Sequence, residues 1–132
     1  MSEQSDTPAS VQALVVDDDP INRMLASKML KKLGWTVAEA VDGRDALTYL
    51  SGQLAGVVLL DISMPGLSGD EVCRIIRETY PRTMRVIAYT AHGMPEERKK
   101  FMESGFDALL IKPITRQSLM QALQDVGALP AS

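Results

Sequence analysis

Residues 13–20 read ALVVDDDP, an apolar run that ends in three aspartates and a proline. Four successive apolar residues suit a strand that is buried on both faces of a parallel sheet. Pro20 suits the first turn of a helix, because that position needs no backbone N–H and the fixed φ of proline matches the helix. Asp18 and Asp19 both stand where a capping residue belongs, and we assign the cap to Asp19. The stretch therefore predicts a strand, an acidic turn and a helix in succession.

The same alternation recurs along the rest of the chain. Strands are predicted at residues 13–16, 35–40, 56–60, 86–89 and 108–111. Helices are predicted at residues 20–33, 44–50, 70–79, 95–104 and 115–126. Five such units predict an α/β fold, a doubly wound five-stranded parallel sheet with five helices. Folds of this kind place their sites at the carboxyl ends of the strands.

Composition limits the classes of function. The 132 residues are 45% hydrophobic, which is enough for the core of one ordinary domain, and the net charge of −3 argues against a nucleic-acid surface. No run approaches the roughly 20 apolar residues that would span a bilayer. A single cysteine, Cys73, excludes an internal disulfide and fits a buried thiol in a reducing compartment. We expect a cytoplasmic domain over residues 11–127, a disordered leader or linker at 1–10 and a tail at 128–132.

Polar residues with complementary chemistry fall at the ends of four predicted strands. Asp17 and Asp18 follow the first strand, Asp61 ends the third, Thr90 follows the fourth and Lys112 ends the fifth. Three neighbouring carboxylates repel one another, and a hard divalent cation with oxygen ligands relieves that repulsion, which favours Mg²⁺ over zinc. A lysine adds positive charge and a threonine adds a hydroxyl donor. The set suits the stabilisation of a transferring phosphoryl group.

These motifs, in this order and spacing, resemble the receiver domains of response regulators. The resemblance covers about residues 12–126 and implies a flavodoxin-like sheet with the strand order 2-1-3-4-5. It rests on four segments: Val15-Val16-Asp17-Asp18-Asp19-Pro20, Leu60-Asp61-Ile62-Ser63-Met64-Pro65-Gly66 with Gly69, Thr90-Ala91 and Lys112-Pro113.

The resemblance implies a role for each site residue. Asp61 would be the phospho-acceptor, the residue that becomes 4-aspartylphosphate. Asp17 and Asp18 would bind Mg²⁺, with Asp61 and the backbone carbonyl of Ser63 as the remaining protein ligands. Thr90 would bond a phosphoryl oxygen.

Lys112 would pair with the aspartate or with the phosphate, and the family has a cis peptide bond between this lysine and the following proline, here Pro113. Two positions depart from the common pattern. Many receivers have an aromatic residue three positions before the lysine, where this chain has Leu109, and many have asparagine where it has Ser63. Both departures concern output and phosphate lifetime rather than acceptor chemistry.

The resemblance also implies the partners. The phosphoryl group would come from a phosphohistidine on a sensor histidine kinase or a histidine phosphotransfer domain, and the domain would be a monomer or a weak dimer without nucleic-acid or membrane contacts of its own. It would act as a switch or relay and would turn over no outside substrate. The segments Asp19-Pro20-Ile21-Asn22-Arg23 and Lys112-Pro113-Ile114 are similar to those of receivers in hybrid sensor histidine kinases. This similarity favours the interpretation that the chain is the cytoplasmic part of a membrane-anchored sensor kinase.

Three alternatives stay open at this point. The chain could be a free-standing single-domain response regulator. It could be a pseudo-receiver that only docks partners, although the acidic pair, Thr90 and Lys112 argue against this. It could also be a phosphatase of the aspartyl-phosphate type, but those enzymes need a general-acid aspartate two residues after the nucleophile, where this chain has Ser63.

Overall fold

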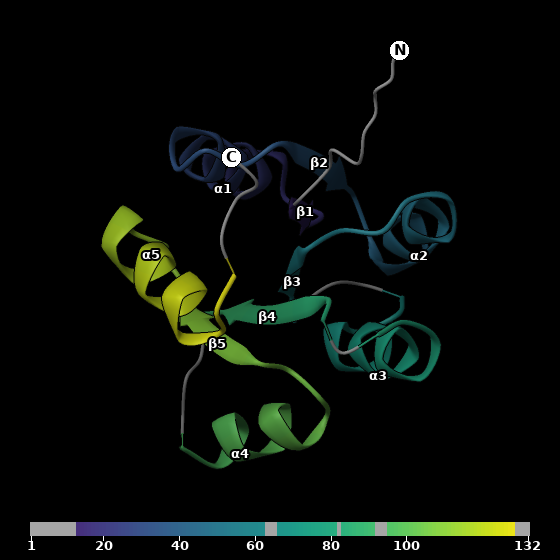
Figure 1. The fold of residues 1–132 in the computed structure, drawn as a ribbon. Coiled ribbons are helices and arrows are strands. Elements are labelled where there is room, and N and C mark those ends of the chain that lie inside the picture. Colours follow the sequence, from purple (N-terminus) through teal and green to yellow (C-terminus); the bar gives the residue numbers. More distant parts are fainter. Residues whose placement is uncertain (1–12, 63–65, 82, 92–94, 129–132) are drawn as a thin grey trace.

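Strands and helices alternate along the whole described chain (Figure 1). The structure is a computed structural model that describes residues 13–62, 66–81, 83–91 and 95–128. Within them the strands are β1 (Ala13–Val16), β2 (Val37–Ala40), β3 (Val57–Asp61), β4 (Arg85–Thr90) and β5 (Ala108–Ile111). The helices are α1 (Pro20–Lys32), α2 (Gly43–Gly52), α3 (Gly69–Thr79), α4 (Pro95–Glu103) and α5 (Arg116–Asp125).

The five strands form one parallel sheet in the order β2-β1-β3-β4-β5. This confirms the predicted doubly wound topology and strand order. The strand order reverses at β1, whose neighbours are β2 and β3, so the carboxyl ends of β1 and β3 border the switch point where such folds bind ligands.

Helices cover both faces of the sheet (Figure 1). The helices α1 and α5 lie on one face, while α2, α3 and α4 lie on the other. Successive residues of a strand point to opposite faces. Leu14 and Val16 accordingly pack in the core beneath α2 and α3, whereas Ala13 and Val15 pack beneath α1 and α5. Burial on both faces explains why β1 is a continuous apolar run rather than an alternating one.

The ends of α1 match the capping prediction but shorten the strand that follows. The Asp19 carboxylate accepts a hydrogen bond from the backbone N–H of Ile21 at 2.9 Å, which confirms Asp19 as the cap. At the other end Gly34 has a φ of 100°, and the N–H of Trp35 donates to the carbonyl of Leu30 at 3.0 Å. The predicted strand at 35–40 therefore begins only at Val37, because the backbone of Trp35 closes the helix end.

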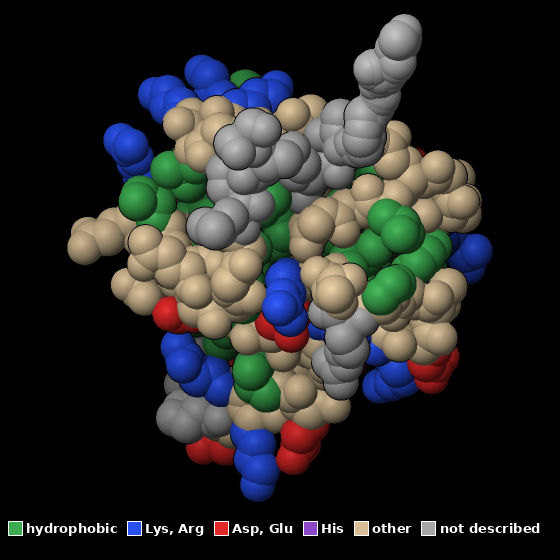
Figure 2. Space-filling model, in the orientation of Figure 1, with side chains coloured by type: hydrophobic (Ala, Val, Ile, Leu, Met, Phe, Trp, Pro, Cys, Tyr) green, Lys and Arg blue, Asp and Glu red, His purple; other side chains and the backbone are tan. Residues whose placement is uncertain are grey.

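Figure 2 shows basic side chains gathered over one helix and hydrophobic side chains over another. Lysine and arginine side chains gather over α1, where Lys28, Lys31 and Lys32 are exposed. Hydrophobic side chains form a patch over α2. Among the described residues, no helix combines the length and the apolar character that crossing a membrane requires.

Candidate functional site

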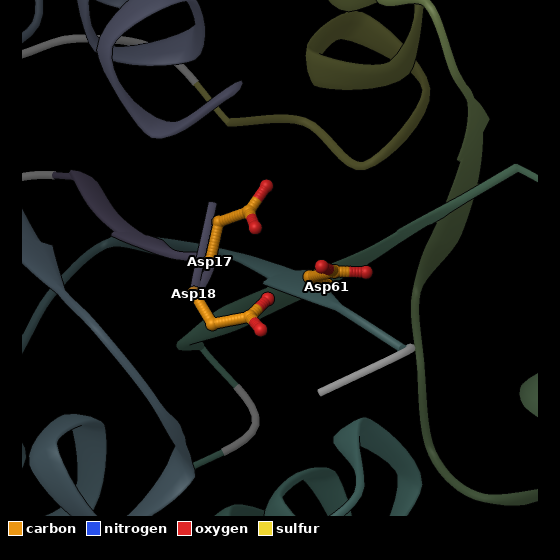
Figure 3. Close-up of side chains that lie close together, drawn as sticks. All are labelled: Asp17, Asp18 and Asp61. Carbon is orange, nitrogen blue, oxygen red and sulfur yellow. The ribbon is translucent and has the colours of Figure 1, made fainter. Parts of the chain in front are cut away.

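Three carboxylates meet at the carboxyl ends of β1 and β3 (Figure 3). Asp17 and Asp18 directly follow β1, and Asp61 is the last residue of β3. Each offers an oxygen that lies within 4.8 Å of an oxygen from the other two. Asp17 and Asp61 are buried, with exposures of 0% and 2%, while Asp18 is exposed. Buried negative charges at this spacing need compensating positive charge.

The register of the sheet explains the convergence. Val16 lies beside Leu60, and Asp61 lies beside Tyr89 in the next strand. By strand alternation, Asp17 continues the row of Val15, and Asp61 continues the corresponding row of β3. Both rows face the layer of α1 and α5. The two buried carboxylates are therefore neighbours on one face of the sheet, as the strand-end prediction required.

Lys112 supplies positive charge directly beside the cluster. Its Nζ lies 3.3 Å from Oδ2 of Asp61 and 3.9 Å from Oδ2 of Asp17. The backbone holds the lysine at this edge, because its N–H donates to the carbonyl of Thr90 at 2.8 Å. The peptide bond between Lys112 and Pro113 is cis, as the resemblance implies.

Thr90 belongs to the same edge. It is the last residue of β4, is 4% exposed and follows Tyr89, the residue that lies beside Asp61. The structure thus brings Asp17, Asp61 and Lys112 into contact range and places Thr90 at the adjacent strand end. Ser63 lies outside the described residues.

Two further residues hold Asp17, and both were absent from the sequence-based site. The hydroxyl of Tyr89 donates a hydrogen bond to Oδ2 of Asp17. Burial, and then the hydrogen bond to Asp17, raise the pKa of the Tyr89 phenol far above its usual range, so it remains a donor at neutral pH. Arg23 donates to the backbone carbonyl of Asp17 at 2.9 Å and also pairs with Glu39 at 3.0 Å. The turn after β1 is therefore fixed through both its backbone and its side chain.

The site has the donor atoms that a metal ion needs. Its donors are carboxylate oxygens from three residues, which suits hard divalent cations rather than soft, thiolate-binding ones. One ammonium group faces three carboxylates, so the cluster keeps an excess of negative charge that a cation would neutralise. A cation and a lysine around one buried carboxylate create the electrostatic setting that phosphoryl transfer requires.

Sheet order and acidic edge together define a class: flavodoxin-like α/β domains with a carboxylate site at the switch point. Comparison with known families specifies the class further. The sequence model described as "Response regulator receiver domain" matches residues 13–124. The chain belongs to this family.

Relatives and solved structures agree with that membership. The chain is 40% identical over 119 residues to the sensor histidine kinase RcsC of Salmonella typhi, which covers 90% of this chain and 12% of that protein. It is 36% identical over 135 residues to hybrid signal transduction histidine kinase L of Dictyostelium discoideum, covering 95% of this chain and 8% of that protein. The chain thus spans only a small part of these curated relatives.

Among solved structures, chemotaxis protein CheY4 of Vibrio cholerae superimposes with a TM-score of 0.82 at 28% identity, covering 89% of this chain and 99% of that one. A response regulator receiver domain from Clostridium thermocellum gives a TM-score of 0.79 at 30% identity, covering 88% and 93%.

Proposed function

We propose that this receiver domain takes a phosphoryl group from a phosphohistidine onto Asp61, with Mg²⁺ held by Asp17, Asp18 and Asp61. The single observation that carries the proposal is the position of Lys112 Nζ, 3.3 Å from a buried Asp61 carboxylate that also borders two other carboxylates. Such an arrangement combines a carboxylate nucleophile with charge-neutralising groups on two sides.

The proposed step breaks the P–N bond of the phosphohistidine and forms a bond between phosphorus and a carboxylate oxygen of Asp61. The donor imidazole leaves and takes up a proton. Lys112 pairs with the Asp61 carboxylate before the transfer and with the phosphoryl oxygens after it. The Thr90 hydroxyl donates a hydrogen bond to one of these oxygens. Bound Mg²⁺ would supply charge neutralisation for the phosphoryl oxygens. Asp17 and Asp18 would hold that ion. Attack by water on the phosphorus breaks its bond to Asp61, releases inorganic phosphate and restores the carboxylate, which ends the signal.

The surface beside the site supports a protein donor rather than a small one. On α1, Ile21 and Leu25 are 63% and 47% exposed. Next to them a cavity of about 70 Å³ is lined by Leu25, Met29, Lys112 and Pro113, among others. An exposed apolar strip adjoining the acceptor site suits the docking of a partner helix. We propose that a histidine kinase or histidine phosphotransfer domain binds here.

The context proposed for the domain is a hybrid sensor histidine kinase in the cytoplasm. The support is that two similar proteins are named as a sensor histidine kinase and a hybrid histidine kinase, and that both are far longer than this chain. In that context the domain catalyses only its own phosphorylation and dephosphorylation, and relays the phosphoryl group to a further histidine.

Acetyl phosphate tests the acceptor assignment without a partner protein. With Mg²⁺ present, intact-mass spectrometry should show one added phosphoryl group on the wild-type chain and none on Asp61→Asn. Asp42→Asn is a matched control, because Asp42 caps α2 and is not a member of the acidic cluster, and asparagine caps helices equally well. Labelling of Asp61→Asn to the wild-type level would refute the proposal.

A further inference from the structure

Tyr89 links the two sides of the acidic site. Its hydroxyl donates to Oδ2 of Asp17, and Nζ of Lys112 lies 4.8 Å from the centre of its ring. We propose that Tyr89 is a positioning residue for the metal site, which holds the Asp17 carboxylate in the orientation that binds the cation. This inference rests on the proposed Mg²⁺ role of Asp17 and deepens it.

The Asp17 carboxylate is fixed at both oxygens. Oδ1 accepts a hydrogen bond from the backbone N–H of Asp19 at 2.9 Å, and Oδ2 accepts the bond from Tyr89. Its side chain is completely buried, which favours these two protein donors over water. A carboxylate oxygen accepts more than one interaction. Both oxygens therefore keep the capacity to bind a cation while their direction is set by the protein.

Tyr89 itself is held rigidly. It is 1% exposed and packs in the core beneath α1 and α5 together with Ile87 and Leu110. Its backbone lies beside Asp61 in the sheet, and its carbonyl accepts from the N–H of Ile62 at 3.1 Å. A phenol anchored in this way presents its hydroxyl from a fixed point, and second partners of this kind tune the affinity of metal ligands.

Lys112 lies near the same Asp17 oxygen that accepts the hydrogen bond from Tyr89. The charged atoms of Lys112 and Asp17 are 3.9 Å apart, which is longer than a hydrogen bond, while Lys112 is closer to Asp61. Without the hydroxyl, the buried Oδ2 of Asp17 would lose its donor, and the Lys112 ammonium, 3.9 Å away, is placed to replace it. Closure of that ion pair would withdraw Asp17 from the cation. Removal of the hydroxyl should therefore weaken Mg²⁺ binding.

The test compares Tyr89→Phe with Tyr49→Phe. The first change removes only the hydroxyl and keeps the ring that packs in the core and lies under Lys112. The second removes the hydroxyl of a partly buried tyrosine on α2, remote from the site. Calorimetric titration with Mg²⁺ should show about 10-fold weaker binding for Tyr89→Phe and wild-type binding for Tyr49→Phe. The Mg²⁺ concentration for half-maximal labelling by acetyl phosphate should rise by the same factor, with the rate at saturating Mg²⁺ retained.

Unchanged or tighter Mg²⁺ binding by Tyr89→Phe would overturn the inference, as would a loss of labelling that saturating Mg²⁺ does not restore. A second measurement uses the wild-type chain: the Tyr89 hydroxyl proton should give a slowly exchanging NMR resonance that persists when Mg²⁺ is added, and its disappearance would show that the cation displaces the phenol. Calorimetry reads this inference without any phosphorylation. Failure of labelling in every protein, with the calorimetric difference intact, would therefore count against the proposed function alone.

Discussion

Neighbouring aspartates at the site differ in burial and in the groups that they contact. Asp17 and Asp61 are buried, with carboxylate oxygens 3.9 Å and 3.3 Å from Nζ of Lys112, whereas Asp18 is exposed. Asp19, the next residue, points to its own helix and caps α1 instead. Asp18 and Asp19 thus carry the same charge but lie in different surroundings, and of these two only Asp18 is a candidate ligand of the cation.

That difference makes Asp18→Asn and Asp19→Asn a matched pair. Both changes remove one negative charge, and asparagine still caps a helix. Asp18→Asn should weaken Mg²⁺ binding about a hundredfold, because a charge pair near a protein surface at ~4 Å is worth about 4 kcal/mol before salt screening. Asp19→Asn should change it far less. Calorimetry measures both, and equal losses in the two variants would show that general charge rather than coordination attracts the ion.

At the scale of elements, the start of α3 determines how closely that helix approaches the acceptor strand. A Cβ atom on Gly69 would lie 2.6 Å from the carbonyl oxygen of Asp61 and 2.8 Å from Cα of Ile62. Both neighbours are backbone atoms that cannot turn aside. Glycine is therefore required here by close approach, which gives a physical reason for its place in the motif that follows Asp61.

Gly69→Ala should consequently displace α3 or the end of β3. Overpacking of this kind destabilises by about 1–3 kcal/mol. Gly52→Ala is the matched control, because a Cβ there would meet nothing within 4 Å and alanine favours helix. Urea unfolding measures both variants. Equal stability of Gly69→Ala and wild type would contradict the close packing of α3 on β3.

The first turn of α3 also predicts a dependence on pH. The Ser68 hydroxyl donates to Asp70 at 2.6 Å, and this bond holds the pKa of Asp70 below its usual range although burial opposes it. A depressed pKa in the folded state stabilises above the unfolded-state value of about 3.9 and is lost as the pH falls below it. The free energy of unfolding should therefore fall less steeply below about pH 4 in Asp70→Asn than in wild type. Parallel curves in urea unfolding at several pH values would contradict this.

At the scale of the whole molecule, phosphorylation of Asp61 could change the conformation of the distant face formed by α4, β5 and α5. Leu109 lies in β5 and lines a groove of about 550 Å³ between α4, β5 and α5. It is partly buried and carries neither a ring nor a hydroxyl. The receiver resemblance implies that an aromatic ring at the position of Leu109 would swing inward when the residue at the position of Thr90 moves toward the phosphoryl group. Leucine fills the space without exposing or hiding a polar group, so it offers little differential interaction with the two states.

We therefore expect weak coupling between the site and the far face. Beryllofluoride with Mg²⁺ mimics the phosphoryl group, and amide chemical-shift mapping should show large changes at Asp17, Asp61 and Lys112. Changes along residues 101–103 and 118–121 should be small. Leu109→Tyr should increase them. Large shifts across these segments in the wild-type chain, or dimerisation through them, would favour a conventional output switch over a relay.

Sequence reasoning predicted what depends on periodicity and spacing. The parallel sheet follows from the βα alternation, and the receiver resemblance implied its strand order. The convergence of Asp17 and Asp61 follows from their places at the ends of neighbouring strands. It did not predict the partner of Asp17, because a tyrosine in an apolar strand is read as core. The alternation of β4, which puts Tyr89 on the same face as Asp61, was the available signal.

Contacts between segments that are distant in the chain also could not be predicted from the sequence pattern. Arg77 on α3 donates to the carbonyls of Gly105 and Met84 and pairs with Asp107. These partners lie up to 30 positions away in the chain, and an arginine on a helix is read as solvated unless the fold is known. The fold and the clustering of Asp17, Asp18 and Asp61 were thus predictable, whereas the hydrogen bonds that hold these side chains in place were not.

The central claim, that Asp61 accepts a phosphoryl group from histidine, is tested most directly by transfer from a radiolabelled histidine phosphotransfer domain in the presence of Mg²⁺. We expect the label to move to this chain, hydroxylamine to remove it as expected of an acyl phosphate, and Asp61→Asn to receive none. Label that stays on the donor across a panel of such domains, or that moves equally to Asp61→Asn, would contradict the account.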